Sequence, residues 1–301
     1  MASAITYKAE LVLNKLGLVD TRDKATDLQT VRPNVRRNLT YYPDLGIVYF
    51  ANAKSGTSTI RRTLWNAVDQ KRGTQTLQAN PRAHDNSPAL SISHGTLKIS
   101  GPDEVLDSVF FSVVRHPLVR LVSGFLNKIK PVANNKVWKL YSKRYEVPVD
   151  VQLSFSEFVD HITHDMPHKV DRHFRPQSIN ICYGFAPFTH IGQLEDLRPT
   201  ASFLEGHGVP SIESFQTHAT GAADYLKDYF SDPGTLKKAV KFLEKDFERF
   251  NYAPNIENIL PLGPITPPKA DTTLLRTILQ VDATPEKMTG SPPARAAQSA
   301  D

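Results

Sequence analysis

Two short apolar segments, each followed by polar residues and a helical pattern, constrain this chain more than any other feature. Residues 46–50 (GIVYF) and 109–114 (VFFSVV) are rich in β-branched and aromatic residues and too short for helices, so we expect two buried strands. A turn at residues 54–59 (KSGTST) and an amphipathic pattern at 60–68 follow the first strand, and residues 188–192 predict a third strand. Strands that alternate with helices form a central, mostly parallel sheet flanked by helices, which is the α/β class.

The turn at 54–59 has the composition of an anion site. At a helix N-terminus, free backbone N–H groups and the positive end of the helix dipole face one point, and Lys54 adds a full charge. A Walker loop of a nucleotide kinase needs a second Gly just before its Lys. Here Lys54 comes first, and Gly56 and the hydroxyl residues Thr57, Ser58 and Thr59 follow it. This order argues against a kinase, which stays as an alternative.

A second element follows the second strand, where Arg115 is followed eight residues later by Ser123. Each of the two elements is common by chance when taken alone, but both follow strands and they come in a fixed order. This order resembles the sulfotransferases, which use 3′-phosphoadenosine 5′-phosphosulfate as donor. The resemblance implies that the first element holds the 5′-phosphosulfate and that Arg115 and Ser123 hold the 3′-phosphate. The implied donor-binding residues are Lys54, Ser55, Gly56, Thr57, Ser58, Thr59, Arg115 and Ser123.

The resemblance extends over about residues 40 to 255. The segments 171–177 (DRHFRPQ), 191–197 (IGQLEDL) and 242–252 (FLEKDFERFNY) are similar to the Golgi carbohydrate sulfotransferases of the chondroitin 4-O and HNK-1 type. The segments at 155–159 and 217–221 fit the same pattern. The resemblance implies a P-loop-like sulfotransferase fold, an enzyme and a carbohydrate acceptor. One residue departs from the pattern: His116 follows Arg115 where the family more often has an acidic residue.

Sulfuryl transfer also needs a base with a pKa near neutral to accept the proton of the acceptor hydroxyl. His94 and His173 are the candidates, and we place His94 ahead of His173. His94 ends an expected strand at 91–94, in the region where uronyl 2-O-sulfotransferases have His-Gly-His, although Thr96 replaces the second His. His173 belongs to the segment shared with the 4-O-type enzymes. The alternative for either residue is a buried structural histidine.

The charge distribution favours an anionic partner. The formal net charge is +5, and no acidic residue occurs between Asp107 and Glu146. A doubly phosphorylated donor or an acidic glycan would suit such a stretch. No aromatic-basic interleaving, zinc finger or recognition-helix pattern points to nucleic acid. The eight basic residues of the stretch are Arg115, Arg120, Lys128, Lys130, Lys136, Lys139, Lys143 and Arg144.

The sequence gives little indication of a metal site or of a membrane-spanning segment. His161, His164 and His168 have ligand-like spacing, but Pro167 interrupts their helix, so we expect no metal site. The single cysteine, Cys182, excludes an internal disulfide. No apolar run approaches the roughly 20 residues of a spanning helix. We therefore expect a soluble, cytoplasmic protein such as a bacterial relative, or a Golgi-associated one in a eukaryote.

The chain divides into three parts by composition. Residues 1–40 are a polar lead-in, 41–261 are the sulfotransferase domain, and 262–301 are a Pro-rich segment that we expect to be disordered apart from a short helix near 273–281. One long amphipathic helix is expected at 236–250. A non-catalytic glycan-binding scaffold descended from the enzyme is the other alternative function.

Overall fold

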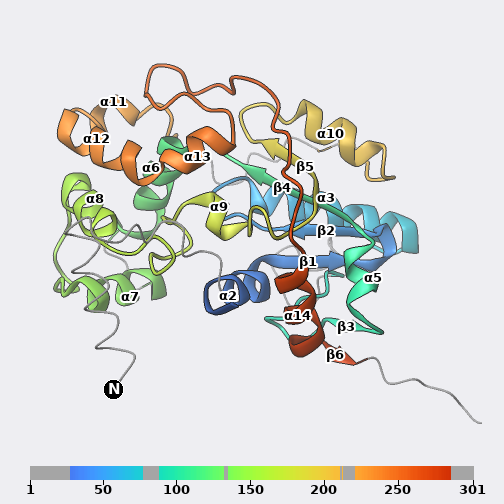
Figure 1. Cartoon of the computed structure of the whole chain (residues 1–301). Helices are drawn as coiled ribbons and strands as arrows, with labels where there is room; N and C mark the ends of the chain where they lie inside the picture. Colours follow the sequence, from blue (N-terminus) through green and yellow to red (C-terminus); the bar gives the residue numbers. More distant parts are fainter. Residues whose placement is uncertain (1–27, 77–87, 132–134, 211, 213–220, 286–301) are drawn as a thin grey trace, which may run out of the picture.

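The computed structural model describes residues 28–76, 88–131, 135–210, 212 and 221–285. Its main sheet has the order β1-β2-β4-β5, formed by Leu39–Tyr42, Ile47–Phe50, Val109–Val114 and Phe188–Gln193 (Figure 1). The pairs β2–β4 and β4–β5 are parallel, and β1 is antiparallel to β2. The strands predicted at 46–50, 109–114 and 188–192 are therefore present, and the predicted α/β class is confirmed.

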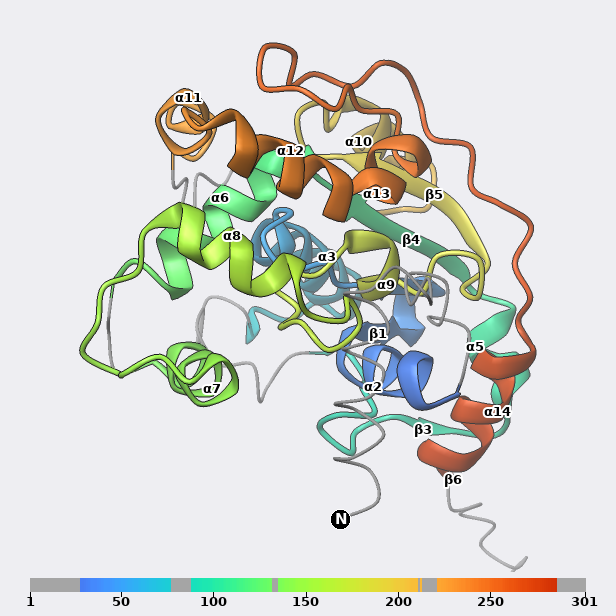
Figure 2. The ribbon, with the colours of Figure 1, turned by 60° about the vertical axis from the view of Figure 1, so that its left-hand side comes forward.

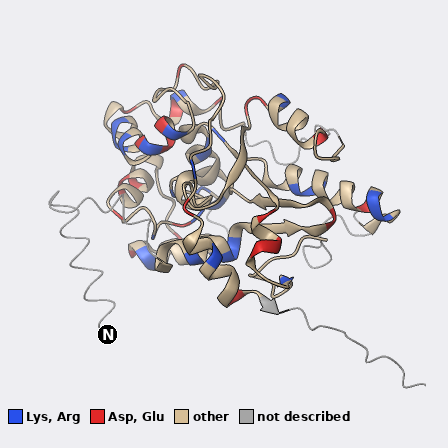
Figure 3. Ribbon diagram, turned by 45° about the vertical axis from the view of Figure 1, so that its right-hand side comes forward, with Lys and Arg blue, Asp and Glu red and all other residues tan. Residues whose placement is uncertain are grey.

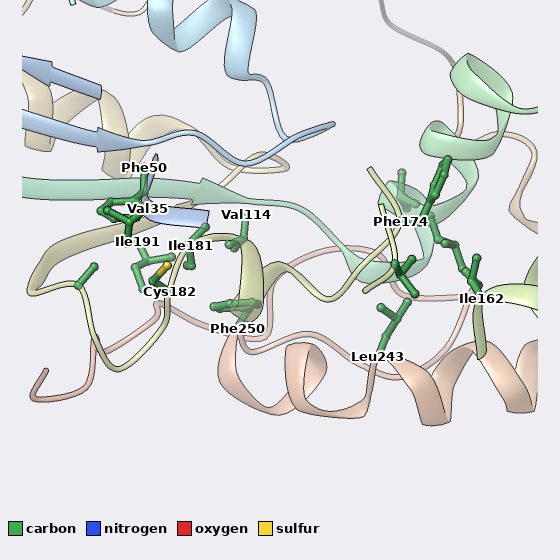
Figure 4. Close-up of a cluster of buried hydrophobic side chains, with 14 of the residues drawn as sticks. Val35, Phe50, Val114, Ile162, Phe174, Ile181, Cys182, Ile191, Leu243 and Phe250 are labelled. Atoms are coloured by element: carbon green, nitrogen blue, oxygen red, sulfur yellow. The ribbon is translucent and has the colours of Figure 1, made fainter. Parts of the chain in front are cut away.

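Side chains of the central strands alternate between two helical layers, as the pleat of a strand requires. Tyr49 and Phe111 stack at 5.0 Å on one face, where they pack with residues of α3 (Thr57–Arg72) and α10 (Arg198–Glu205). Residues of β2 and β4 that point the other way, such as Phe50 and Val114, join a larger core. Figure 4 shows part of this larger core, which also contains Cys182.

The larger core extends from the sheet into a group of helices packed around α6 (Pro117–Lys128), as Figure 2 shows. These helices include α7 (Lys136–Tyr145), α8 (Phe155–Thr163), α11 (Leu226–Tyr229) and α12 (Pro233–Phe242). Phe125 of α6 contacts Phe155 and Phe158 of α8, each at 5.2 Å between ring centroids. Ser154 caps α8 in a reciprocal capping box with Glu157, which fixes the start of the helix at Phe155.

Two sequence expectations about local structure are wrong. The helix expected at 236–250 is divided at Leu243 into α12 and α13 (Glu244–Arg249). The break lets Asp246 of α13 turn its carboxylate into the core, where backbone N–H groups of α9 (Gln177–Asn180) donate to it. The strand expected at 91–94 is a turn instead, because the amides of residues 96 and 97 both donate to the carbonyl of Ser91.

A helix of the C-terminal part packs against the rest of the domain. The short helix expected near 273–281 is present as α14 (Thr273–Asp282), and it buries Leu275, Ile278 and Leu279 against α2 (Leu28–Asn38) and α5 (Pro102–Leu106). Apolar residues every three or four positions give α14 a face to bury, whereas disorder over 262–301 remains an expectation from composition. Residues 286–301 lie outside the described part.

The remaining elements are small. β3 (Lys98–Ile99) and β6 (Thr284–Pro285) form a two-stranded parallel sheet, and a 3-10 turn, η2 (Pro43–Leu45), joins β1 to β2. Within the described ranges, no helix is both long and apolar enough to cross a bilayer.

Candidate functional site

The predicted anion loop connects the end of β2 to the start of α3, at the carboxyl edge of the sheet. Gly56 is the N-cap of α3 with a φ of 71°, and its carbonyl accepts the first i→i−4 bond from Ile60. The amides of Thr57 and Ser58 precede that bond and so have no acceptor within the helix. The left-handed backbone at position 56 favours glycine, and a Cβ there would lie 2.8 Å from Leu194 Cδ1, so the Leu194 side chain would have to shift. The loop therefore has the geometry of an anion cradle.

Lys54 lies half-buried in this loop among other cations. Burial, together with the charges of Lys128, Arg115 and Arg120, lowers its pKa to about 8. Its backbone also has a φ of 68°. The ammonium group is therefore held where positive charge is already concentrated, and a bound anion would relieve this repulsion.

Arg115 lies beside Lys54, directly after β4. Its Nη1 is 3.5 Å from the carbonyl oxygen of Lys54, and its Nε is 3.9 Å from Glu195 Oε1. Burial lowers the pKa of the guanidinium, which still leaves it charged at neutral pH. Ser123 lies on α6 with 1% of its surface exposed. The structure thus brings Lys54 and Arg115 together and places Ser123 two helical turns further along the element that Arg115 precedes.

The carboxylate of Glu195 lies near Arg115, although the residue that follows Arg115 in the sequence is a histidine. Glu195 accepts hydrogen bonds from the amide of His116 at 3.0 Å and from the hydroxyl of Tyr252 at 2.5 Å, and burial raises its pKa. His116 turns its ring away, with Nε2 3.2 Å from the carbonyl of Ala253, and burial lowers its pKa to about 4. The histidine at position 116 is therefore neutral and buried in the core, and it adds no charge to the site.

Sequence reasoning missed the residue that connects the two predicted elements. Gln177 Oε1 accepts from Asn52 Nδ2 at 2.8 Å, from Ser55 Oγ at 3.2 Å and from the Arg115 amide at 2.9 Å. Its Nε2 donates to the Arg115 carbonyl at 2.7 Å. Asp246 in turn fixes Gln177 by accepting its backbone N–H. The sequence pointed to position 177 only because it lies in the segment similar to carbohydrate sulfotransferases. That resemblance assigned no role to Gln177.

His173, one of the two predicted bases, is paired with a carboxylate. Its Nδ1 is 2.6 Å from Asp171 Oδ1, and 13% of its side chain is exposed. Burial lowers the pKa of His173, which favours the neutral ring at neutral pH. Burial works against ionisation of Asp171, but the hydrogen bonds from His173 outweigh it and lower the pKa of Asp171 to about 2. An ionised Asp171 holds a proton on Nδ1 and leaves Nε2 of His173 as the acceptor.

Lys128 relates His173 to the anion loop. Its charge lowers the pKa of both His173 and Lys54, so it lies within electrostatic range of both groups. The backbone of His173 rests on α6 at Gly124, where a Cβ would lie 2.8 Å from the His173 carbonyl oxygen. Lys128 is therefore the charge that acts on both Lys54 and His173, and we group these three residues with Arg115 as the site cluster.

His94 is not linked to this cluster. It is exposed in a turn, and among the described residues its hydrogen bonds are to Ser91, with Nδ1 3.1 Å from Ser91 Oγ. Of the three spaced histidines, His161 contacts the Tyr141 hydroxyl and His164 its own helix. In the part of the chain that is described, no group of three metal-ligating side chains occurs.

The basic stretch divides between the site and the surface. Arg115, Arg120 and Lys128 converge on Lys54, whereas Lys136, Lys139 and Lys143 lie on the exposed face of α7. Figure 3 shows further basic residues on helices of both layers, interspersed with acidic ones. Three cations of the stretch therefore act on Lys54, and the other lysines named face solvent.

Comparison with known proteins agrees with this geometry. A family model described as the sulfotransferase family matches residues 37–253, which is more than half of the chain. The chain therefore belongs to the sulfotransferase family, and the predicted family and P-loop-like fold are confirmed. No curated protein and no solved structure matches it.

Proposed function

We propose that this protein transfers a sulfuryl group from 3′-phosphoadenosine 5′-phosphosulfate to a hydroxyl of a carbohydrate. The observation that carries the proposal is the placement of Lys54 and Arg115 at the N-terminus of α3, in a chain of the sulfotransferase family. The anion loop would hold the 5′-phosphate, with the hydroxyls of Thr57, Ser58 and Thr59 as further ligands. Arg115 and Ser123 would hold the 3′-phosphate.

The chemistry is an in-line displacement at sulfur. The acceptor oxygen forms a bond to sulfur, the bond from sulfur to the bridging oxygen breaks, and 3′-phosphoadenosine 5′-phosphate leaves with the negative charge. Lys54 would stabilise that charge on the leaving oxygen, because a fixed cation in a water-poor site acts more strongly than one in water. No metal ion takes part in this scheme.

His173 is the base that the contacts favour. A neutral imidazole whose Nδ1 is fixed by Asp171 offers Nε2 to the acceptor hydroxyl, which is the arrangement that general-base catalysis needs. His94 has no comparable carboxylate partner among the described residues and serves as the matched comparison. The cationic neighbourhood favours an acceptor that carries acidic groups.

Two measurements test the proposal. The first is calorimetric binding of 3′-phosphoadenosine 5′-phosphate to the wild type, to Arg115→Ala and to Arg276→Ala, a matched surface arginine on α14. We expect micromolar affinity that Arg115→Ala loses and Arg276→Ala keeps. A folded wild type that does not bind the nucleotide would refute the enzyme and favour the scaffold alternative.

The second measurement is transfer of labelled sulfate from the donor to a panel of neutral and acidic glycans. His173→Ala should lower kcat by about 10²- to 10⁴-fold and leave nucleotide binding unchanged. His94→Ala should retain near wild-type activity. The reverse result for the two histidines would assign the base to His94.

A further inference from the structure

Arg120 is a buried cation that, within the described part of the chain, donates hydrogen bonds to three backbone oxygens. It lies on α6 with 1% of its surface exposed. Its Nε donates to the Ala53 carbonyl at 2.8 Å. Its Nη1 donates to the Arg175 carbonyl at 2.9 Å, and its Nη2 to the Arg172 carbonyl at 2.7 Å. One planar guanidinium thus binds three carbonyls from two separate segments.

This arrangement is costly for stability alone. A buried charge loses its hydration, and here burial lowers the pKa of Arg120 to about 10. Asp246 and Asp171 influence it electrostatically, but the hydrogen bonds given above are to carbonyls rather than to either carboxylate. An apolar side chain of similar length would avoid the cost of burying a charge but would leave the three carbonyls without this donor. The guanidinium therefore calls for a role beyond filling the core.

The two bound segments are those that carry the proposed catalytic groups. Ala53 directly precedes Lys54, and Arg172 and Arg175 flank His173. The N–H donors of a guanidinium have a fixed planar geometry, so the hydrogen bonds hold the two backbone segments in a fixed position relative to each other. One turn along α6, Gly124 supports the His173 carbonyl, so a single helix positions both sides of the reaction centre.

We infer that Arg120 is a positioning residue that fixes the separation of Lys54 and His173, an inference that rests on the proposed function. A displacement of about 1 Å between reacting groups can lower a rate by about 10²-fold. Lysine keeps the charge but offers a single nitrogen, which cannot span three carbonyls. Glutamine keeps two donors without the charge.

The test compares Arg120→Lys and Arg120→Gln with Arg276→Lys, the same exchange at the surface of α14. Nucleotide binding by calorimetry counts the folded sites, and kcat is expressed per binding site. We expect kcat per site to fall by about 10- to 100-fold in the Arg120 variants and to stay unchanged in Arg276→Lys. We expect nucleotide affinity to change by less than about threefold in Arg120→Lys, which keeps the charge. A purely structural role would lower the melting temperature and the number of binding sites, but not kcat per site.

A double-mutant cycle separates positioning from general damage. In the His173→Ala background, Arg120→Lys should lower the residual kcat by less than about threefold, because the group that it positions is gone. Unchanged kcat per site in Arg120→Lys would overturn the inference, as would a full additional loss in the His173→Ala background. A wild type without sulfuryl transfer would instead refute the proposed function, so the two failures are distinguishable.

Discussion

The pKa of Lys54 predicts how nucleotide affinity depends on pH. With a pKa of about 8, Lys54 is mostly charged at pH 7 and mostly neutral at pH 9. A bound anion favours the charged form, so binding above pH 8 must take up a proton and affinity must fall as pH rises. The affinity for 3′-phosphoadenosine 5′-phosphate should be about tenfold lower at pH 9 than at pH 7, or about 1.4 kcal/mol. Calorimetric titration at half-unit steps of pH measures this directly.

The control is Lys54→Met, which removes the titrating group and keeps the length of the side chain. Arg115 stays charged throughout this range, and the phosphates of the ligand are ionised above their pKa near 6. The variant should therefore bind more weakly than the wild type at pH 7 and show a flat profile from pH 7 to pH 9. A flat profile in the wild type, or an equal slope in both proteins, would refute the argument that the crowded Lys54 controls binding.

Three further predictions concern packing and burial. Gly124→Ala should lower kcat at least about tenfold with little change in nucleotide affinity, because its Cβ would displace the segment that carries the proposed base; equal kcat in Gly124→Ala and in Gly101→Ala, whose Cβ meets no atom within 4 Å, would contradict this. Asp246→Ala should lower the free energy of unfolding in urea by about 3–5 kcal/mol, since it leaves buried donors of α9 unpaired; a loss below about 1 kcal/mol would count against it. Leu275→Ala should cost about 2–5 kcal/mol in the same assay and Val281→Ala, at an exposed position, well under 1 kcal/mol; equal effects would mean that α14 does not pack as described.

The sheet and the anion loop could be predicted because their signals are local. A strand buried on both faces is a short apolar run, and a loop that needs a left-handed residue before a helix favours Gly, as at Gly56. Lys54 and Arg115 were found in the same way, since Arg115 directly follows β4 and Lys54 comes four residues after the end of β2. The prediction then needed only the rule that the carboxyl ends of parallel strands meet at one edge.

The connecting residues could not be predicted, because their partners are far away in the sequence. Gln177 contacts residues 62 and 125 positions away, and Asp246 reaches back 69 positions. In the sequence, Arg120 is one more basic residue of the positive stretch. Nothing in the neighbouring residues indicates that its guanidinium donates hydrogen bonds to distant backbone carbonyls. The divided helix at Leu243 was missed for the same reason, since the buried carboxylate of Asp246 acts on α9 rather than on its own helix.

The left-handed backbone of Lys54 has a consequence for how this protein can evolve. A residue with a β-carbon at a φ of 68° is disfavoured relative to glycine by about 1–2 kcal/mol. Glycine would relieve that strain but would also remove the cation on which the proposed chemistry depends. The loop is therefore a point where selection for stability and selection for activity oppose each other, and the rest of the fold has to compensate for the strained lysine.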